Sequence, residues 1–171
     1  MELWNLYDKD RVLTKETMVR GDEMKKDMYH LVVHVVIINS ENQMLIQQRQ
    51  WDKIGAPGLW DITVGGSVLA GETSQEGAIR EISEGLGIEL DLNQRPHLSV
   101  TFDHGYDDIY IVNQEVELDS LNVPNDEVLD TKWASIDEIY EIIDNKSFIN
   151  YRKSLIQLLF DMRYSYGGKN D

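Results

Sequence analysis

Residues 66–88 read GSVLAGETSQEGAIREISEGLGI and form the most specific pattern in this chain. Thr73 and Glu76 stand three positions apart and have the form of a capping box, which marks the start of a helix. Gly87 stands where a glycine commonly ends a helix. Between them, apolar residues recur at helical spacing: Ala78, Ile79, Ile82 and Leu86. The segment therefore predicts a helix between Thr73 and Gly87.

Two carboxylates on this helix indicate metal chemistry. Glu81 and Glu84 are three residues apart, so they project from one face of the helix, and position 85 would join them. Crowded carboxylates repel one another unless a hard cation lies between them, and Mg²⁺ binds oxygen ligands while it keeps some of its waters. Such an ion can hold phosphate oxygens and lower the pKa of a bound water. The pattern predicts a Mg²⁺ site, with Mn²⁺ as the alternative ion.

The whole segment resembles the Nudix box of diphosphate hydrolases, and all but one of the defined positions match. The matching residues are Gly66, Glu72, Arg80, Glu81, Ile82, Glu84, Gly87 and Ile88. A weaker likeness extends from about His30 to Ile139. The resemblance implies a single domain over residues 1–171, built as an α/β/α sandwich with a mixed central sheet. It also implies Mg²⁺-dependent hydrolysis of a nucleoside diphosphate linked to another moiety.

The resemblance assigns roles within the box. Glu81 and Glu84 are expected to act in catalysis and to bind the metal. The carbonyl of Gly66 is expected to approach the same metal, because a glycine has no side chain in the way. Glu72 and Arg80 are expected to be structural and to hold the loop and the helix together.

Candidate residues also lie outside the box. In the family a late acid can complete the metal site, and we assign Asp108 to this role, with Asp107 and Glu127 as alternatives. A Gly-Tyr-Asp-Asp run such as residues 105–108 is most often a plain turn. His30 and Arg49 are assigned to substrate binding. Isolated strand histidines are more often hydrogen-bonded core residues, and for His30 the pocket and the core are equally weighted alternatives.

One position departs from the box, because Gly85 replaces a glutamate that is a central metal ligand in the family. The loss lowers the negative charge and the number of ligands together. The chain is then either a hydrolase with a weakened metal site or a protein that binds a diphosphate metabolite without turnover. The alternative interpretation is that Gly85 only loosens the last helical turn, by about 1 kcal/mol relative to alanine.

A second resemblance is to type 1 isopentenyl-diphosphate isomerase, a Nudix relative. It rests on residues 125–133 and on the stretch from His30 to Trp60. The active-site cysteine of that enzyme corresponds to Gly65 here, and one of its histidine ligands corresponds to Ser67. We therefore expect no isomerase activity.

The remaining segments predict strands mixed with helices. An N-terminal hairpin extension covers about residues 1–28, with strands at Leu3–Tyr7 and Val12–Val19 and a loop at 21–28. Further strands are expected at His30–Ile38, Met44–Arg49, Leu59–Val64, 97–103 and 108–117, and further helices at about 135–144 and 150–162. The nearly continuous apolar run at His30–Ile38 is typical of a strand buried on both faces.

Composition and charge exclude several classes of protein. The formal net charge is −15, with 16 basic and 31 acidic residues, so no basic footprint for nucleic acid exists. Cysteine is absent, which excludes disulfides and thiol nucleophiles. Neither a signal-peptide pattern nor a membrane-spanning apolar run is visible, so we expect a cytoplasmic protein. The expected partner is a small-molecule diphosphate, and a homodimer contact through the hairpin is left open.

Overall fold

A mixed sheet of seven strands forms the centre of the computed structural model, which describes residues 1–170. Strand β3 (His30–Ile38) pairs with β4 (Met44–Arg49), β6 (Val64–Ser67) and β8 (Gly105–Asn113). Strands β5 (Trp60–Asp61) and β9 (Val128–Ala134) pair with β4, and β7 (Leu98–Phe102) pairs with β8. Only the β3–β8 pair is parallel among these, so the predicted mixed sheet is confirmed.

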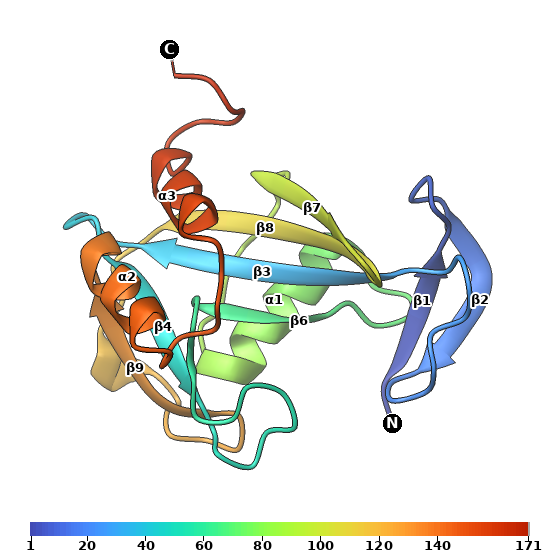
Figure 1. Ribbon diagram of the computed structural model, residues 1–171, viewed down its shortest axis with the longest axis horizontal. Coiled ribbons are helices and arrows are strands. Elements are labelled where there is room, and N and C mark those ends of the chain that lie inside the picture. The colour runs from blue at the N-terminus through green and yellow to red at the C-terminus, as the bar shows by residue number, and fades with distance from the viewer. Residues whose placement is uncertain (171) are drawn as a thin grey trace.

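Helices cover both faces of the sheet, as Figure 1 shows. Helix α1 (Ser74–Leu86) covers one face, and α2 (Ile136–Asp144) and α3 (Lys153–Asp161) cover the other. Strand β3 supplies both cores because successive side chains point to opposite faces. Val33 and Val35 pack on the α1 side, whereas Val36 and Ile38 pack on the side of α2 and α3. The predicted sandwich is therefore confirmed. A short 3₁₀ helix, Leu118–Ser120, lies in the connection to β9.

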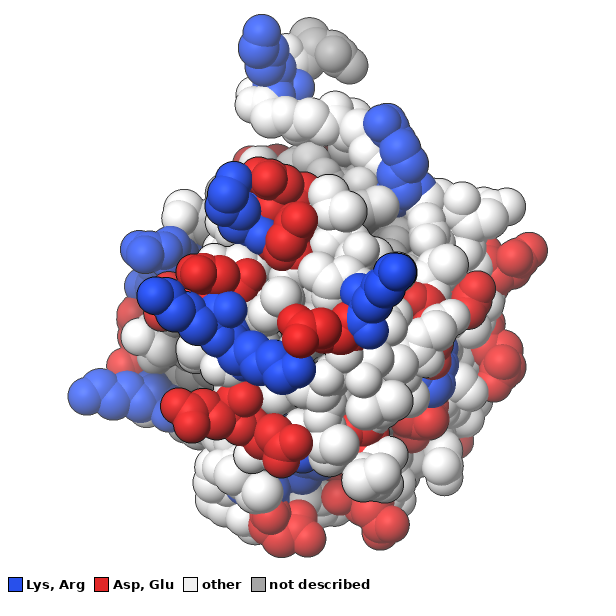
Figure 2. All heavy atoms as spheres, turned by 90° about the vertical axis from the view of Figure 1, so that its right-hand side faces the viewer, with Lys and Arg blue, Asp and Glu red and all other residues white. Residues whose placement is uncertain are grey.

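The N-terminal hairpin forms a separate two-stranded sheet of β1 (Leu3–Tyr7) and β2 (Leu13–Val19), as predicted. It lies beyond the end of the central sheet (Figure 1). The Leu3 carbonyl accepts a hydrogen bond from Ala70 N at 2.7 Å, which ties the hairpin to the loop before α1. On this side of the molecule, basic and acidic side chains lie interspersed (Figure 2).

The ends of α1 follow the predicted signals. The Thr73 hydroxyl accepts a hydrogen bond from Glu76 N at 3.2 Å and so caps the first turn. Gly87 ends the helix with a φ of 72°, a left-handed conformation that glycine adopts without strain. The cap residues thereby define where helix α1 begins and ends. No helix within residues 1–170 is long and apolar enough to cross a membrane.

Two predictions of local structure are wrong. The third strand is broken into β5 and β6, because the Thr63 hydroxyl between them donates to Leu45 O and accepts from Ile37 N. Residues 105–108 are not a turn but the start of β8, in parallel register with His30–Val33. A side chain at Gly105 would overlap the His30 carbonyl, so this close strand approach requires glycine.

Candidate active site

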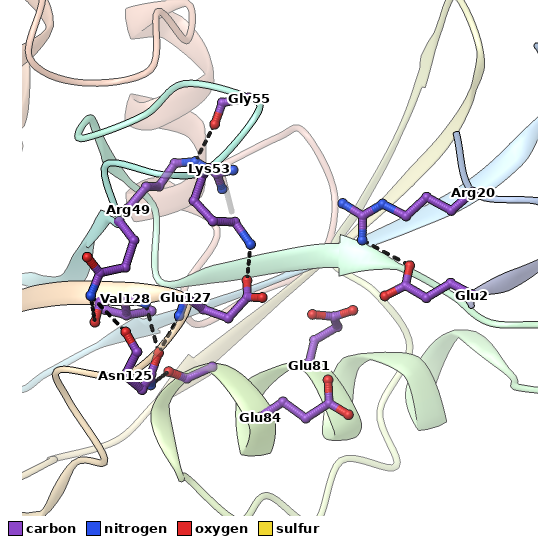
Figure 3. A network of polar contacts seen from close by, with 12 residues as sticks. Glu2, Arg20, Arg49, Lys53, Gly55, Glu81, Glu84, Asn125, Glu127 and Val128 are labelled. Carbon is purple, nitrogen blue, oxygen red and sulfur yellow. Dashed lines mark hydrogen bonds and ion pairs between the residues drawn. The ribbon is translucent and has the colours of Figure 1, made fainter. Parts of the chain in front are cut away.

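A cavity of about 260 Å³ lies between the second half of α1 and the strands β4, β6 and β9. The hairpin closes one side of it. Its charged lining residues are Glu2, Arg20, Arg49, Lys53, Glu81, Glu84 and Glu127. Figure 3 shows these side chains converging from α1, from the end of β4 and the loop after it, from the residue before β9, and from the hairpin. Sequence positions from 2 to 127 therefore meet at one place.

Glu81 is the most enclosed carboxylate of this cavity, with a side chain that is 20% exposed. The Gly66 backbone passes directly against it, and a side chain at position 66 would overlap the Glu81 carboxyl group. Burial raises the pKa of Glu81 to about 7, although the neighbouring Arg80 opposes this rise. Glu84, one turn further along the helix, is 64% exposed. The structure thus brings Gly66, Glu81 and Glu84 together, as the sequence predicts.

Arg80 joins the loop before α1 to the helix itself. Its Nε donates to Glu72 Oε1 at 2.6 Å, and its Nη2 donates to Glu72 Oε2 at 3.1 Å and to Ser67 O at 2.9 Å. Glu72 also accepts from Leu69 N at 2.9 Å. Burial alone would raise the pKa of Glu72, but the hydrogen bonds from Arg80 hold it below its usual value. These hydrogen bonds hold the loop before α1 against the helix, which is the structural role expected for Glu72 and Arg80.

Position 85 faces the cavity, where Gly85 is a lining residue. A Cβ placed there would lie 3.0 Å from Val64 Cγ2. The Gly85 carbonyl accepts from Asn125 Nδ2 at 2.9 Å, which links the end of α1 to the segment before β9. The carboxylate that the family carries at this position would therefore belong to the cavity that Glu81 and Glu84 also line.

Three cations also line the cavity. Lys53 Nζ lies 2.7 Å from Glu127 Oε2, and Arg20 Nη1 lies 2.9 Å from Glu2 Oε2. In Figure 3 these two ion pairs stand on opposite sides of Glu81 and Glu84. Arg49 donates from Nε to Gly55 O at 2.9 Å, which leaves its terminal nitrogens available to an anion.

The family follows from this geometry together with a match over most of the chain. A family model for the NUDIX domain matches residues 28–157. The chain belongs to the Nudix family. It is 39% identical over 164 residues to an uncharacterised Nudix hydrolase of Listeria innocua, a match that covers 95% of this chain and 96% of the relative. It is thus a Nudix-type pyrophosphohydrolase, an enzyme that acts on acid anhydrides.

A solved structure supports the same fold. The crystal structure of DR0079 from Deinococcus radiodurans matches with a TM-score of 0.76 and 23% identity, over 92% of this chain and 97% of that one. A weaker similarity links the chain to the isopentenyl-diphosphate Delta-isomerase of Shigella flexneri, with 29% identity over 127 residues and 68% of each chain covered. A side chain at Gly65, the position of the isomerase cysteine, would overlap the His34 ring.

Asp108 and His30, which the sequence assigned to the metal and to the substrate, lie away from the cavity beside α1. Asp108 is 1% exposed and accepts from Arg11 Nη1 at 2.8 Å and from the Ser74 and Ser99 hydroxyls at 2.7 Å. Burial alone would raise the pKa of Asp108, but these bonds hold it below its usual value. His30 stacks on Trp4 with ring centroids 4.2 Å apart. Neither is among the residues that line the cavity.

The late acids have different positions. Asp107 lies 2.8 Å from His34 Nδ1, outside the lining, whereas Glu127 reaches the cavity. Sequence reasoning missed Glu2, Arg20 and Lys53, because no local pattern connects them with α1. Arg49, by contrast, lies in the cavity where substrate binding was expected.

Nudix hydrolases generally need a divalent metal, and the residues present suit one that retains waters. Within residues 1–170, no three acidic or histidine side chains form a ready ligand cluster. Glu81 and Glu84 nevertheless line the same cavity as Gly66, and both accept from Arg80 Nη1, at 3.0 Å and 3.3 Å. Mg²⁺ is commonly held by one or two carboxylates, waters and substrate phosphates. Glu81 and Glu84 would hold such an ion.

Proposed function

We propose that this Nudix enzyme hydrolyses the diphosphate of a nucleoside diphosphate linked to a second moiety, with Mg²⁺ held by Glu81, Glu84 and the Gly66 carbonyl. The observation that carries the proposal is the enclosed Glu81 carboxylate, which faces a cavity with three cations on its walls. Arg20 and Lys53 are paired with Glu2 and Glu127, so Arg49 is the cation that attracts a diphosphate first. A Nudix fold with this arrangement supports phosphorus chemistry at Glu81.

The residues of the chain divide the reaction between them. Arg49 binds phosphate oxygens of the substrate, and Lys53 joins it once it exchanges Glu127 for the substrate. Glu81 accepts a proton from the attacking water as the water oxygen bonds to phosphorus and the bridging P–O bond breaks. When bound, Mg²⁺ neutralises charge on the phosphates.

Phosphate release from a panel of nucleotide and isoprenoid diphosphates tests this proposal, with Mg²⁺ or Mn²⁺ present. Glu81→Gln should abolish release, whereas Glu76→Gln should not. Glu76 is the matched control because it lies on the same helix but is exposed and outside the cavity. No release from any compound by the native protein would refute hydrolysis.

A second candidate function is binding without turnover. It is favoured by Gly85, which lines the cavity where a further carboxylate would stand. Titration of Mg²⁺ against both binding and turnover separates the two functions. Saturable binding of a diphosphate without product at any metal concentration would support the binding protein, and turnover that rises with metal would exclude it.

A homodimer through the hairpin stays a prediction.

A further inference from the structure

One buried side chain of the cavity has an unused hydrogen-bonding group. Gln47 on β4 is 6% exposed and is a lining residue. Its Oε1 is buried and has no hydrogen-bond partner within residues 1–170. The two other glutamines at this end of β4 differ, because Gln48 donates to Gly58 O at 3.0 Å and Gln50 donates to Asn125 O at 2.7 Å. Among these three glutamines, a buried amide oxygen without a partner is thus particular to Gln47.

The strands beside β4 offer Gln47 no partner. Its cross-strand neighbours are Thr131 on β9 and Asp61 on β5. Asp61 Oδ1 accepts from Tyr151 OH and from Ile62 N, both at 2.7 Å. A buried amide oxygen without a partner destabilises the fold, since it loses its water without replacement. Buried polar groups almost always have a partner, so an orphan at a cavity wall is placed to bond a water or a ligand.

The position of Gln47 along β4 indicates where in the cavity such a ligand would lie. Leu45, Gln47 and Arg49 alternate along β4 and therefore share one face of the sheet. Leu45 packs in the core on the α1 side, and Arg49 lines the cavity among its cations. Gln47 lies between them, deeper than Arg49. A group attached to a diphosphate that is held near Arg49 would reach it.

The cavity wall also restricts the kind of group. Apart from Val64 and Val128 and its glycines, every lining residue is polar or charged. An apolar chain placed there would remove water from charged groups and return no hydrogen bonds. A hydroxylated group would replace that water and pair with the amide, which both donates and accepts.

We infer that Gln47 is a specificity-determining residue, whose side-chain amide bonds a hydroxyl of the organic group and so selects hydroxylated over apolar diphosphates. The inference rests on the proposed function, because it takes the diphosphate to lie near Arg49. Gln47 on β4 would then select the substrate, whereas Glu81 and Glu84 on α1 would carry out the hydrolysis.

Equilibrium binding with Mg²⁺ tests it, with two nonhydrolysable probes. One is α,β-methylene-ADP, which carries a hydroxylated ribose, and the other is isopentenyl methylenediphosphonate, which carries an apolar chain. The native protein should bind the first at least tenfold more tightly. Gln47→Met keeps the length of the side chain and should remove about tenfold of this preference, the usual effect of one hydrogen bond. Gln114→Met, outside the cavity, is the control.

Thermal melting without probe gives a second readout. Gln47→Met removes the orphaned amide, so its melting temperature should equal or exceed that of the native protein. Three results would overturn the inference. The first is that the native protein binds neither probe, the second is that it binds both with equal affinity, and the third is that Gln47→Met loses affinity for both probes by the same factor. Binding selectivity without any turnover would refute the hydrolysis alone, and turnover without selectivity would refute only the role of Gln47.

Discussion

Restoring the missing carboxylate by Gly85→Glu is the sharpest test of the metal site. Position 85 lines the cavity, so the new side chain would extend toward Glu81 and Glu84. The substitution fits with a small adjustment, because its Cβ would lie 3.0 Å from Val64 Cγ2 and the valine must move by a few tenths of an ångström. The backbone bond between the Gly85 carbonyl and Asn125 does not depend on the side chain.

The expected energies follow from these contacts. Removal of a helical glycine favours folding by about 1 kcal/mol, and the crowding of Val64 opposes it by roughly 1 kcal/mol. Repulsion among three carboxylates makes the metal-free variant slightly less stable. If the third carboxylate tightens Mg²⁺ binding about tenfold, saturating Mg²⁺ stabilises the variant by about 1.4 kcal/mol more than the native protein. For a chain of this size, that is a further rise in melting temperature of about 3–6 °C.

Thermal melting with and without Mg²⁺, together with turnover of an accepted diphosphate, measures the effect. Gly85→Gln is the matched control, since it makes the same contact with Val64 but adds no charge. We expect the larger Mg²⁺ response and the faster turnover in Gly85→Glu alone. An equal response of the two variants would show that position 85 does not serve the metal.

Three further outcomes are expected. Burial raises the pKa of Glu81 to about 7, so above that pH its ionised form destabilises the metal-free fold. The variant Glu81→Gln, which cannot ionise, should therefore have a higher melting temperature than the native protein at pH 8. An unchanged melting temperature would count against the burial argument. Arg11→Ala should lower the free energy of unfolding by about 2 kcal/mol near pH 7, less than for a fully buried pair because Arg11 is partly exposed. Because the folded pKa of Asp108 is lowered, this loss should be full above about pH 4 and shrink as the pH falls further, which unfolding at several pH values measures; a loss independent of pH would contradict it. Nucleic acid should not bind, and submicromolar affinity at about 150 mM salt would disprove this.

The sequence predicts those parts of the site that depend on short spacings. Glu81 and Glu84 share a helix face because they are three residues apart, and the ends of α1 follow from Thr73 and Gly87. The apolar run of β3 predicts its burial on both faces. Each of these features depends on local geometry, which periodicity captures.

Contacts between distant segments could not be predicted in this way. Asp108 was assigned to the metal, yet its partner Arg11 lies 97 positions earlier in the chain. The acidic residues at 107 and 108 suggested a turn, because nothing nearby revealed that His34 and Arg11 would pair with them inside a sheet. Gln47 is inconspicuous in a polar stretch, and its missing partner becomes visible only when the neighbouring strands are placed.

The hairpin gives the molecule a modular character. It precedes the region matched by the family model, which begins at residue 28, yet Glu2 and Arg20 form part of the cavity wall. Glu81 and Glu84 on one side and Glu2 and Arg20 on the other therefore come from separate segments of the chain, which are joined through Ala70 and Asp108. Evolution can exchange or lengthen such an appended hairpin without disturbing helix α1, which carries Glu81 and Glu84. New selectivity is then open to relatives that keep the same reaction, and grafting residues 1–27 between them is a direct route for protein engineering.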